Sequence, residues 1–175
     1  MKSQSDRLCE EVLRSIGIKK GFVVLDFGCG SGNYTIPAAR IVGEEGVVYA
    51  LDKDEEALDE LMRRAGSEGL ENVRRIDTKG EVNLKLDDES VDAVLLYDIF
   101  WYFPLSDPRL TSLLKEAYRV LRRKGTLSIL PKHIDPERLR EKIEGIGFRL
   151  RSVYSGAVLH DGVIEKGQIL NFMKA

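Results

Sequence analysis

Cysteine is scarce in this chain of 175 residues, which contains only Cys9 and Cys29. Neither belongs to a CxxC pair, so the sequence indicates no disulfide framework, and we predict no metal site. Cys29 falls in a glycine-rich segment, where its thiol is expected to be a small filler rather than a nucleophile. Residues 1–7 lack an apolar signal core, and no apolar run approaches the length of a membrane span. We therefore expect a cytoplasmic protein with no membrane partner.

The chain also lacks a strong excess of charge, since its formal net charge is −2 at pH 7. This balance gives no electrostatic argument for a nucleic acid or an anionic membrane as partner. The short basic clusters at 63–64, 74–75 and 122–124 are explained by solvated faces and helix ends. Hydrophobic residues at 43% and charged residues at 32% are typical of a globular protein. The length predicts a single domain over residues 1–175.

What the chain does contain is a regular alternation of strand and helix patterns. An amphipathic helix is expected at about 6–16. Strands are then expected at 22–27, 47–52, 73–77, 91–97 and 126–130, and helices at about 33–42, 54–65, 107–122 and 136–145. Two final strands, at about 148–155 and 167–174, have no helical pattern between them, so the last strand should run antiparallel. The alternation predicts an α/β fold with a doubly wound, Rossmann-like sheet of seven strands.

The most specific motif is an apolar strand that runs directly into Gly28-x-Gly30-x-Gly32. Glycine permits the sharp turn from strand to helix and lets a ligand approach the bare backbone. The dinucleotide-binding fingerprint requires its third glycine where this chain has Asn33. Asp26, before the loop, would repel a pyrophosphate but attract an ammonium group. A ligand with adenosine, an amino group and a carboxylate fits this arrangement, and S-adenosylmethionine is such a molecule.

Acidic residues end the next two expected strands. Asp52 lies where an acceptor for ribose hydroxyl groups is expected, although an acid there also suits the start of a helix. Asp77 is predicted to accept a hydrogen bond from an adenine amino group, and an ordinary loop acid is the alternative. Lys53, Thr78 and Asn33 complete the predicted donor site.

Together these motifs resemble class I S-adenosylmethionine-dependent methyltransferases, and among them the UbiE-like, type 11 subgroup. The matching segments are VVLDFGCGSGNYTIPAAR (23–40), VVYALDKDEEAL (47–58), LKLDDESVDAVLLYDIFWYF (84–103), LLKEAYRVLRRKGTLSIL (113–130) and GFRLRSVY (147–154). The resemblance implies the strand order 3-2-1-4-5-7-6 and S-adenosylmethionine as the methyl donor. Between Asp77 and Leu84 the chain is a few residues longer than the family usually is. Glu81 is therefore the alternative to Asp77 at the adenine.

The loop after the fourth expected strand faces the chemistry, because ligands of such sheets bind at the carboxyl ends of the strands. This loop is rich in aromatic residues. Tyr97, Trp101 and Tyr102 are the candidates for a wall around the methyl acceptor. The alternative is that the aromatic residues pack against the core under the following helix.

A general base is needed only if the acceptor must lose a proton. Asp98, at the end of the fourth strand, and His133, after the fifth, are the candidate catalytic residues. His160, expected in the loop before the last strand, is a further candidate, and a surface or capping role is the alternative for each. A catechol-type metal site is disfavoured because Lys132 and His133, not acids, follow the fifth strand.

The sequence therefore predicts a methyltransferase that moves a methyl group from S-adenosylmethionine to a small-molecule acceptor by in-line displacement. Two alternatives are a non-catalytic, methyltransferase-like binding subunit and a nicotinamide-dependent oxidoreductase, and the early third glycine disfavours the second. Few residues precede the first expected strand to form a lid. We therefore expect either an open pocket with a large acceptor or a pocket covered by a second copy or a partner subunit.

Overall fold

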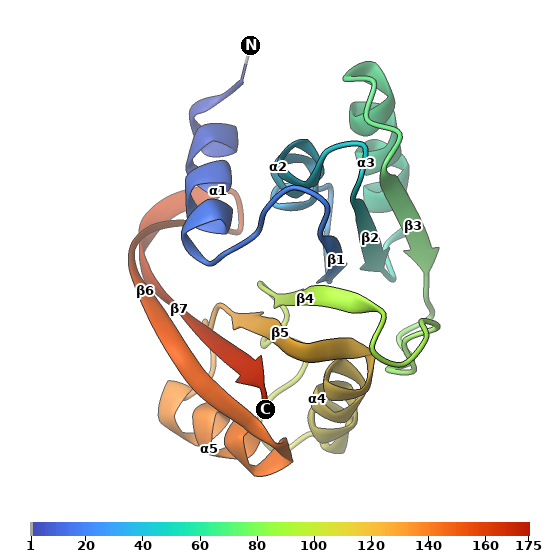
Figure 1. Cartoon of the computed structure of the whole chain (residues 1–175). Helices are drawn as coiled ribbons and strands as arrows, with labels where there is room; N and C mark the ends of the chain where they lie inside the picture. The colour runs from blue at the N-terminus through green and yellow to red at the C-terminus, as the bar shows by residue number, and fades with distance from the viewer. Residues whose placement is uncertain (1) are drawn as a thin grey trace.

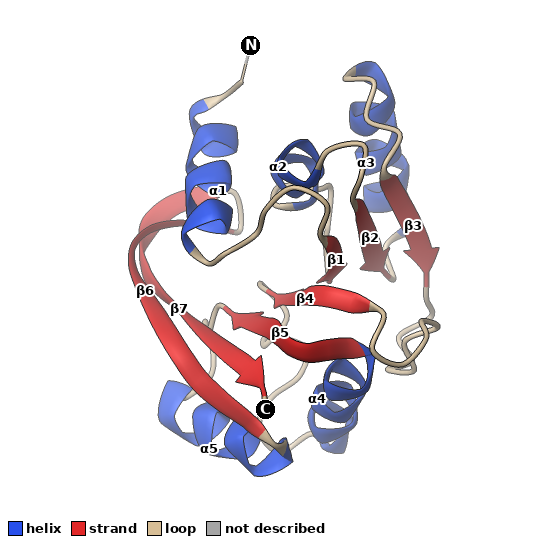
Figure 2. Cartoon of the chain, in the orientation of Figure 1, coloured by secondary structure: helices blue, strands red, loops and turns tan. Residues whose placement is uncertain are grey.

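The expected alternation is present in the computed structural model, which describes residues 2–175 (Figures 1 and 2). The strands are β1 (Val23–Phe27), β2 (Val47–Asp52), β3 (Val73–Asp77), β4 (Val91–Leu96), β5 (Leu121–Ile129), β6 (Phe148–His160) and β7 (Val163–Lys174). The helices are α1 (Gln4–Ser15), α2 (Thr35–Val42), α3 (Glu55–Ser67), α4 (Pro108–Val120) and α5 (Pro136–Ile146). Within residues 2–175, no helix combines the length and apolar character needed to cross a membrane.

The strands form one seven-stranded sheet in the order β3-β2-β1-β4-β5-β7-β6, as the family resemblance implies. β1 to β5 pair in parallel, whereas β7 runs antiparallel to both β5 and β6. The prediction of an antiparallel last strand is therefore confirmed. Because β6 runs in the same direction as β5, its carboxyl end lies at the same edge of the sheet as the carboxyl ends of β1 to β5.

Apolar side chains alternate across the sheet and form a core on each face. Val24 of β1 belongs to a buried cluster with α1, α2 and α3, whereas its neighbour Leu25 belongs to one with α4 and α5. This alternation follows from the two-residue period of a strand. Figure 1 shows the two groups of helices on opposite sides of the sheet. Both faces are covered, as a mainly parallel sheet requires.

Helix starts follow the capping residues of the sequence, with one exception that matters for the site. α1, α3, α4 and α5 begin after Ser3, Asp54, Asp107 and Asp135, each of which accepts a hydrogen bond from a backbone N–H of the first turn. α2 begins after Tyr34, and no side chain caps it. The N-terminus of α2 is the one that follows the glycine loop, so its backbone donors face the region where a ligand is expected.

Two expected boundaries are wrong. β5 begins at Leu121, so Arg122 and Arg123 lie in a strand and not in the last turn of the preceding helix. Backbone pairing between Val91 and Leu121 extends the strand, although a register shift follows it. The final hairpin is also longer than expected, and His160 ends β6 instead of lying in a loop.

A two-residue turn explains the length of this hairpin. Asp161 and Gly162 join β6 to β7 with φ angles of +48° and +77°. Positive φ at both central residues is the signature of a type I′ turn, which an Asp-Gly pair favours strongly. The turn keeps the strands paired from Phe148–Lys174 at one end to His160–Val163 at the other. It therefore carries the hairpin tip to the edge where β1 to β5 end.

Candidate active site

A cavity of about 500 Å³ lies at the carboxyl edge of the sheet. Its walls come from the glycine loop after β1, the end of β2, the loops after β3 and β4, and the hairpin tip between β6 and β7. This volume falls within the range of small-molecule and cofactor sites. Of the sequence-predicted site residues, Asp26, Gly28, Gly30, Asn33, Asp52, Lys53, Thr78, Tyr97, Asp98 and Tyr102 line it. Gly32, Asp77, Trp101 and His133 do not.

The three glycines of the loop all have positive φ, but the space around each of them differs. A Cβ on Gly28 would lie 2.5 Å from Ile99, and one on Gly32 would lie 2.3 Å from Leu61 of α3. These two glycines let the loop pack closely on its neighbours. A Cβ on Gly30 would meet no atom within 4 Å, although this residue lines the cavity. Gly30 therefore keeps open a space that a side chain would fill, which fits a ligand lying against the backbone.

Asp52 fixes the shape of the glycine loop from the end of β2. Its carboxylate accepts a hydrogen bond from the Gly30 N–H at 2.8 Å and another from the Asp54 N–H at 2.9 Å. Asp54, not Asp52, caps α3. Each carboxylate oxygen has a second lone pair, so Asp52 can still accept hydrogen bonds from a ligand. Beside it, the Lys53 ammonium lies 4.5 Å from the centre of the Tyr102 ring, across the cavity.

Of the two acids that the sequence offers for the adenine, Glu81 lines the cavity and Asp77 does not. The Asp77 carboxylate is 2.7 Å from the Arg75 guanidinium, which holds the pKa of Asp77 below its usual value. Glu81 lines the cavity with Thr78, and its carboxylate accepts a hydrogen bond from the Lys79 N–H at 2.9 Å. Hydrogen bonds from its own backbone and from that of Lys79 lower the pKa of Glu81. An anionic acceptor is therefore present at this end of the cavity.

Asp26 is the buried acid of the cavity, with 2% of its surface exposed. Burial raises the pKa of its carboxyl group to about 7, although the Thr35 hydroxyl donates a hydrogen bond to it at 2.7 Å. No basic side chain forms an ion pair with it among the described residues. A ligand cation would complete this environment, because it would stabilise the charged carboxylate that burial disfavours.

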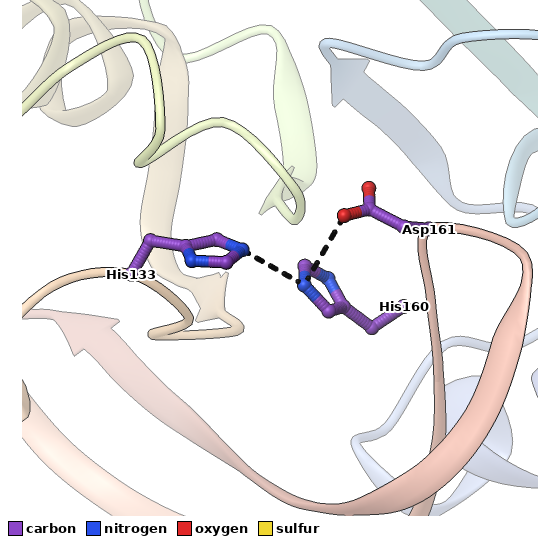
Figure 3. A group of neighbouring side chains, drawn as sticks. All are labelled: His133, His160 and Asp161. Carbon is purple, nitrogen blue, oxygen red and sulfur yellow. Dashed lines mark hydrogen bonds and ion pairs between the residues drawn. The ribbon is translucent and has the colours of Figure 1, made fainter.

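Opposite the glycine loop, the structure joins residues that are distant in the sequence. Asp98, with φ +53°, pairs with Nδ1 of His160. On its other side, Nε2 of His160 lies 3.2 Å from Nε2 of His133 and 3.4 Å from the carboxylate of Asp161 (Figure 3). Burial raises the pKa of Asp98. Sequence reasoning considered both histidines but missed Asp161, although the Asp-Gly turn signal was available.

The aromatic residues after β4 divide between the two roles that the sequence left open. Phe100 is buried in the core, whereas Tyr102 is 54% exposed and lines the cavity. Tyr97 lines the cavity too, but its hydroxyl forms a buried 2.6 Å hydrogen bond with Ser128 of β5. Trp101 is 71% exposed and packs edge-to-face with the His133 ring, with 5.1 Å between the ring centres.

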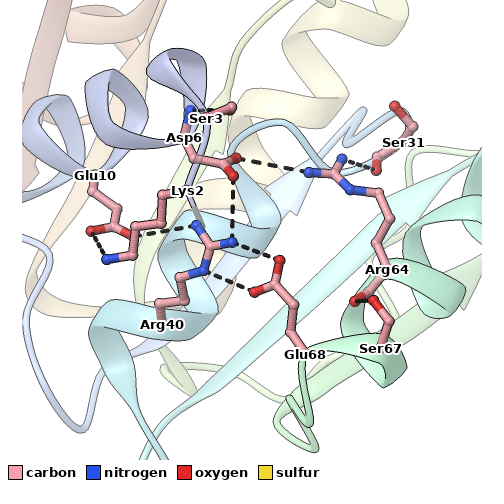
Figure 4. A network of polar contacts seen from close by, with 9 residues as sticks. All are labelled: Lys2, Ser3, Asp6, Glu10, Ser31, Arg40, Arg64, Ser67 and Glu68. Carbon is pink, nitrogen blue, oxygen red and sulfur yellow. Dashed lines mark hydrogen bonds and ion pairs between the residues drawn. The ribbon is translucent and has the colours of Figure 1, made fainter.

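An ion-pair network joins α1 and α3 to α2, the helix that follows the glycine loop (Figure 4). Arg40 of α2 contacts Glu68 at 2.6 Å, Glu10 at 3.3 Å and Asp6 at 3.4 Å. Arg64 of α3 donates a hydrogen bond to the Ser31 carbonyl within the loop at 3.0 Å. Because Arg40 is largely buried and bound by several acids, the network fixes the helices more firmly than isolated surface pairs would.

The chain is similar to known methyltransferases. Residues 24–125 match the family model described as "Methyltransferase domain". Over 117 residues the chain is 34% identical to demethylmenaquinone methyltransferase of Geobacillus stearothermophilus, covering 66% of this chain and 47% of that protein. Over 85 residues it is 38% identical to a probable cobalt-precorrin-6B C(15)-methyltransferase (decarboxylating) of Saccharolobus solfataricus, covering 48% of this chain and 43% of that protein. The chain thus spans less than half the length of these curated relatives.

A solved structure agrees with this similarity over almost the whole chain. The crystal structure of a SAM-dependent methyltransferase from Aquifex aeolicus superposes with a TM-score of 0.76 and 28% sequence identity, covering 95% of this chain and 89% of that one. The similarity therefore includes the β6–β7 hairpin as well as the glycine loop.

Proposed function

We propose that this chain, which belongs to the class I S-adenosylmethionine-dependent methyltransferases, transfers a methyl group to a small-molecule acceptor. One observation carries the proposal. Gly30 leaves open space in a cavity that is also lined by Asp26, a buried acid with no ion-pair partner among residues 2–175, and by Asp52, an acceptor at the end of β2. This arrangement suits a ligand with an ammonium group at one end and a ribose at the other. S-adenosylmethionine, the methyl donor of this family, has both groups.

At the amino-acid end of the donor, we propose that Asp26 binds the ammonium group. The backbone of Gly28 and Gly30, without side chains, lets this end of the donor approach closely. Asn33 lines the same part of the cavity at the uncapped start of α2. Gly32 acts indirectly, by letting the loop pack against α3. Asp52 accepts hydrogen bonds from the ribose hydroxyl groups, and Lys53 lines the cavity beside it.

At the adenine we assign Glu81 and Thr78 in preference to Asp77. Both line the cavity, whereas the Asp77 carboxylate is engaged by Arg75. Glu81→Gln should weaken binding of S-adenosylhomocysteine, because the amide cannot accept hydrogen bonds with both of its polar atoms. Asp77→Asn is the matched control and should leave binding unchanged, and isothermal titration calorimetry can compare the two. If Asp77→Asn is the damaging change, the assignment is reversed.

Methyl transfer requires little of the protein beyond the correct placement of donor and acceptor. The sulfonium donor supplies an electrophilic methyl group, and the chain orients donor and acceptor for in-line displacement and limits access of water. For an acceptor that must lose a proton, we propose Asp98 and His133 as the groups involved, linked through His160. Asp98→Asn should then slow transfer to such an acceptor without weakening donor binding.

We propose that Tyr97, Trp101 and Tyr102 flank the acceptor. The exposure of Trp101 and Tyr102 fits a large apolar acceptor or a second subunit that covers the opening. The similar proteins are named for demethylmenaquinone and cobalt-precorrin-6B, which are acceptors of the small-molecule class. A cytoplasmic location is part of the same proposal.

Thermal unfolding with added ligand tests the proposal. At 100 times its Kd, S-adenosylmethionine or S-adenosylhomocysteine should stabilise the fold by about 2.7 kcal/mol, which raises the midpoint by about 5–11 °C in a chain of this size. Asp52→Ala should remove most of this shift, and Asp77→Asn should keep it. The absence of a shift with both adenosyl ligands would refute the proposal, and a shift with NAD alone would favour the oxidoreductase alternative. Donor binding without transfer to any acceptor in a screen would favour the non-catalytic subunit.

A further inference from the structure

Three metal-ligand side chains meet at the hairpin tip, beside the cavity. One ring nitrogen of His133, one of His160 and a carboxylate oxygen of Asp161 all lie within 4.8 Å of one another (Figure 3). His160 is central, at 3.2 Å from His133 and 3.4 Å from Asp161. Ligand atoms around a tetrahedral zinc ion, each about 2.0–2.1 Å from the metal, are separated by roughly 3.3 Å. The two measured separations are close to this value.

The surroundings of His160 prepare its Nε2 to bind a cation. Asp98 pairs with the opposite ring nitrogen, Nδ1, and so favours the tautomer that carries its proton there. Nε2 then carries a lone pair, and it lies 3.2 Å from a second imidazole nitrogen and 3.4 Å from a carboxylate oxygen of Asp161. A hydrogen bond from His133 satisfies only the first of these contacts. A shared cation satisfies both, and a carboxylate behind the histidine is the usual outer support of a metal ligand.

We propose that His133, His160 and Asp161 bind one divalent transition-metal ion, with Asp98 as the carboxylate that orients His160. Two imidazole nitrogens and one carboxylate suit Zn²⁺ and Co²⁺, whereas Mg²⁺ and Ca²⁺ prefer oxygen ligands alone. The proposal departs from the sequence-based expectation of no metal site. That expectation rested on local spacing, and the two histidines lie 27 residues apart.

Backbone conformation supports a site that is held in place. Asp98 and His133 have φ angles of +53° and +64°, a region that side chains other than glycine rarely adopt. Such conformations persist only where the surrounding structure imposes them, and they concentrate at functional sites. Asp161 also has positive φ, but its turn type requires it.

The site would have a free coordination position next to the cavity. It has three protein ligands, and both Asp98 and Asp161 line the cavity. Three protein ligands with one open position are the arrangement of catalytic rather than structural zinc. The open position would hold an oxygen, nitrogen or sulfur atom of the methyl acceptor. With the ion bound, His133 is a ligand and no longer a base, so the ion takes over from His133 and Asp98 the task of helping the acceptor lose its proton. This last role rests on the proposed function, whereas metal binding does not.

Titration of the whole chain, without an affinity tag, with ZnCl₂ and CoCl₂ tests the proposal. Calorimetry should give one ion per chain, and bound Co²⁺ should show the intense visible absorption of a four-coordinate ion. Asp161→Asn should weaken Zn²⁺ binding at least tenfold while preserving the turn, because asparagine also accepts positive φ. His133→Ala should do the same, and Asp98→Asn should weaken binding by about 10–100-fold. Asp87→Asn, at an exposed acid elsewhere, is the matched control and should have no effect.

Two results would overturn the inference. One is no Zn²⁺ binding up to millimolar concentration by the wild-type chain, which would leave a hydrogen-bonded chain from Asp98 through His160 to His133. The other is binding that Asp161→Asn and His133→Ala both leave unchanged. The thermal shift with S-adenosylhomocysteine, measured on the same samples, reports separately on folding and on the donor site. Loss of that shift alone would count against the proposed function and not against the metal site.

Discussion

The buried carboxyl group of Asp26 should make stability fall as the pH rises towards neutrality. Burial raises its pKa to about 7 in the folded chain, against about 3.9 in an unfolded one. Between these two pH values the carboxyl group of Asp26 carries a proton in the folded state but not in the unfolded state. The stabilising contribution is therefore fully present below about pH 4 and is lost as the pH rises through about 7. Asp26→Asn removes this titration and keeps an oxygen for the Thr35 hydroxyl to donate to.

The size of the effect follows from the gap between the two pKa values. Each pKa unit corresponds to 1.36 kcal/mol, so the two units between pH 5 and pH 7 correspond to about 3 kcal/mol. The wild type should lose that amount relative to Asp26→Asn between pH 5 and pH 8. Binding of a donor with an ammonium group should recover part of it, because the ammonium stabilises the ionised carboxylate.

Urea unfolding of both proteins at pH 5, 6, 7 and 8, at constant ionic strength, measures this difference. Asp77→Asn is the control with the opposite sign. Arg75 lowers the pKa of Asp77, so its contribution is lost only on acidification below its unfolded pKa and should stay constant over pH 5–8. If the free-energy difference between the wild type and Asp26→Asn is the same at pH 5 and pH 8, Asp26 is ionised throughout and the reasoning is wrong.

Further predictions separate the packing role of loop residues from their ligand role. Gly32→Ala should destabilise the fold by about 1–3 kcal/mol, because its Cβ would lie 2.3 Å from Leu61. Gly30→Ala should instead abolish the thermal shift with S-adenosylhomocysteine while destabilising less, and equal effects of the two changes on both readouts would contradict the distinction. Tyr34→Phe should cost about 1–3 kcal/mol in urea unfolding, since its hydroxyl bonds the N–H and C=O of Leu159 at 3.0 and 2.9 Å. An unchanged midpoint would show that water replaces the hydroxyl.

The sheet could be predicted because strand and helix periods alternate clearly, whereas its strand order was implied by the family resemblance. The boundary between α4 and β5 could not. Basic residues such as Arg122 and Arg123 suit a helix end, and only pairing with β4 makes them part of a strand. The length of the final hairpin was predictable in principle from Asp161-Gly162, a turn signal that the sequence reading did not use.

The site was predictable where its residues lie close together in the chain. The loop glycines and Asp52 line or shape the cavity as the motifs indicate. Asp77 differs because Arg75, two residues earlier in the same strand, lies on the same face and holds its carboxylate. The group around His160 was beyond local reasoning, since only the packing of the hairpin beside β5 brings its members together.

The hairpin tip has a consequence for how this protein can diversify. The residues assigned to the amino-acid and ribose ends of the donor all lie within residues 26–53, at the ends of β1 and β2 and in the loops that follow them. The tip at 160–162 is contributed by the sheet's outer hairpin. Loops and turns tolerate substitution far better than the elements that they connect. Exchanging the tip would therefore alter the side of the cavity that Asp161 and Gly162 line, while leaving the residues that we propose for the donor intact. A single fixed cosubstrate could in this way serve many acceptors through changes in one short turn.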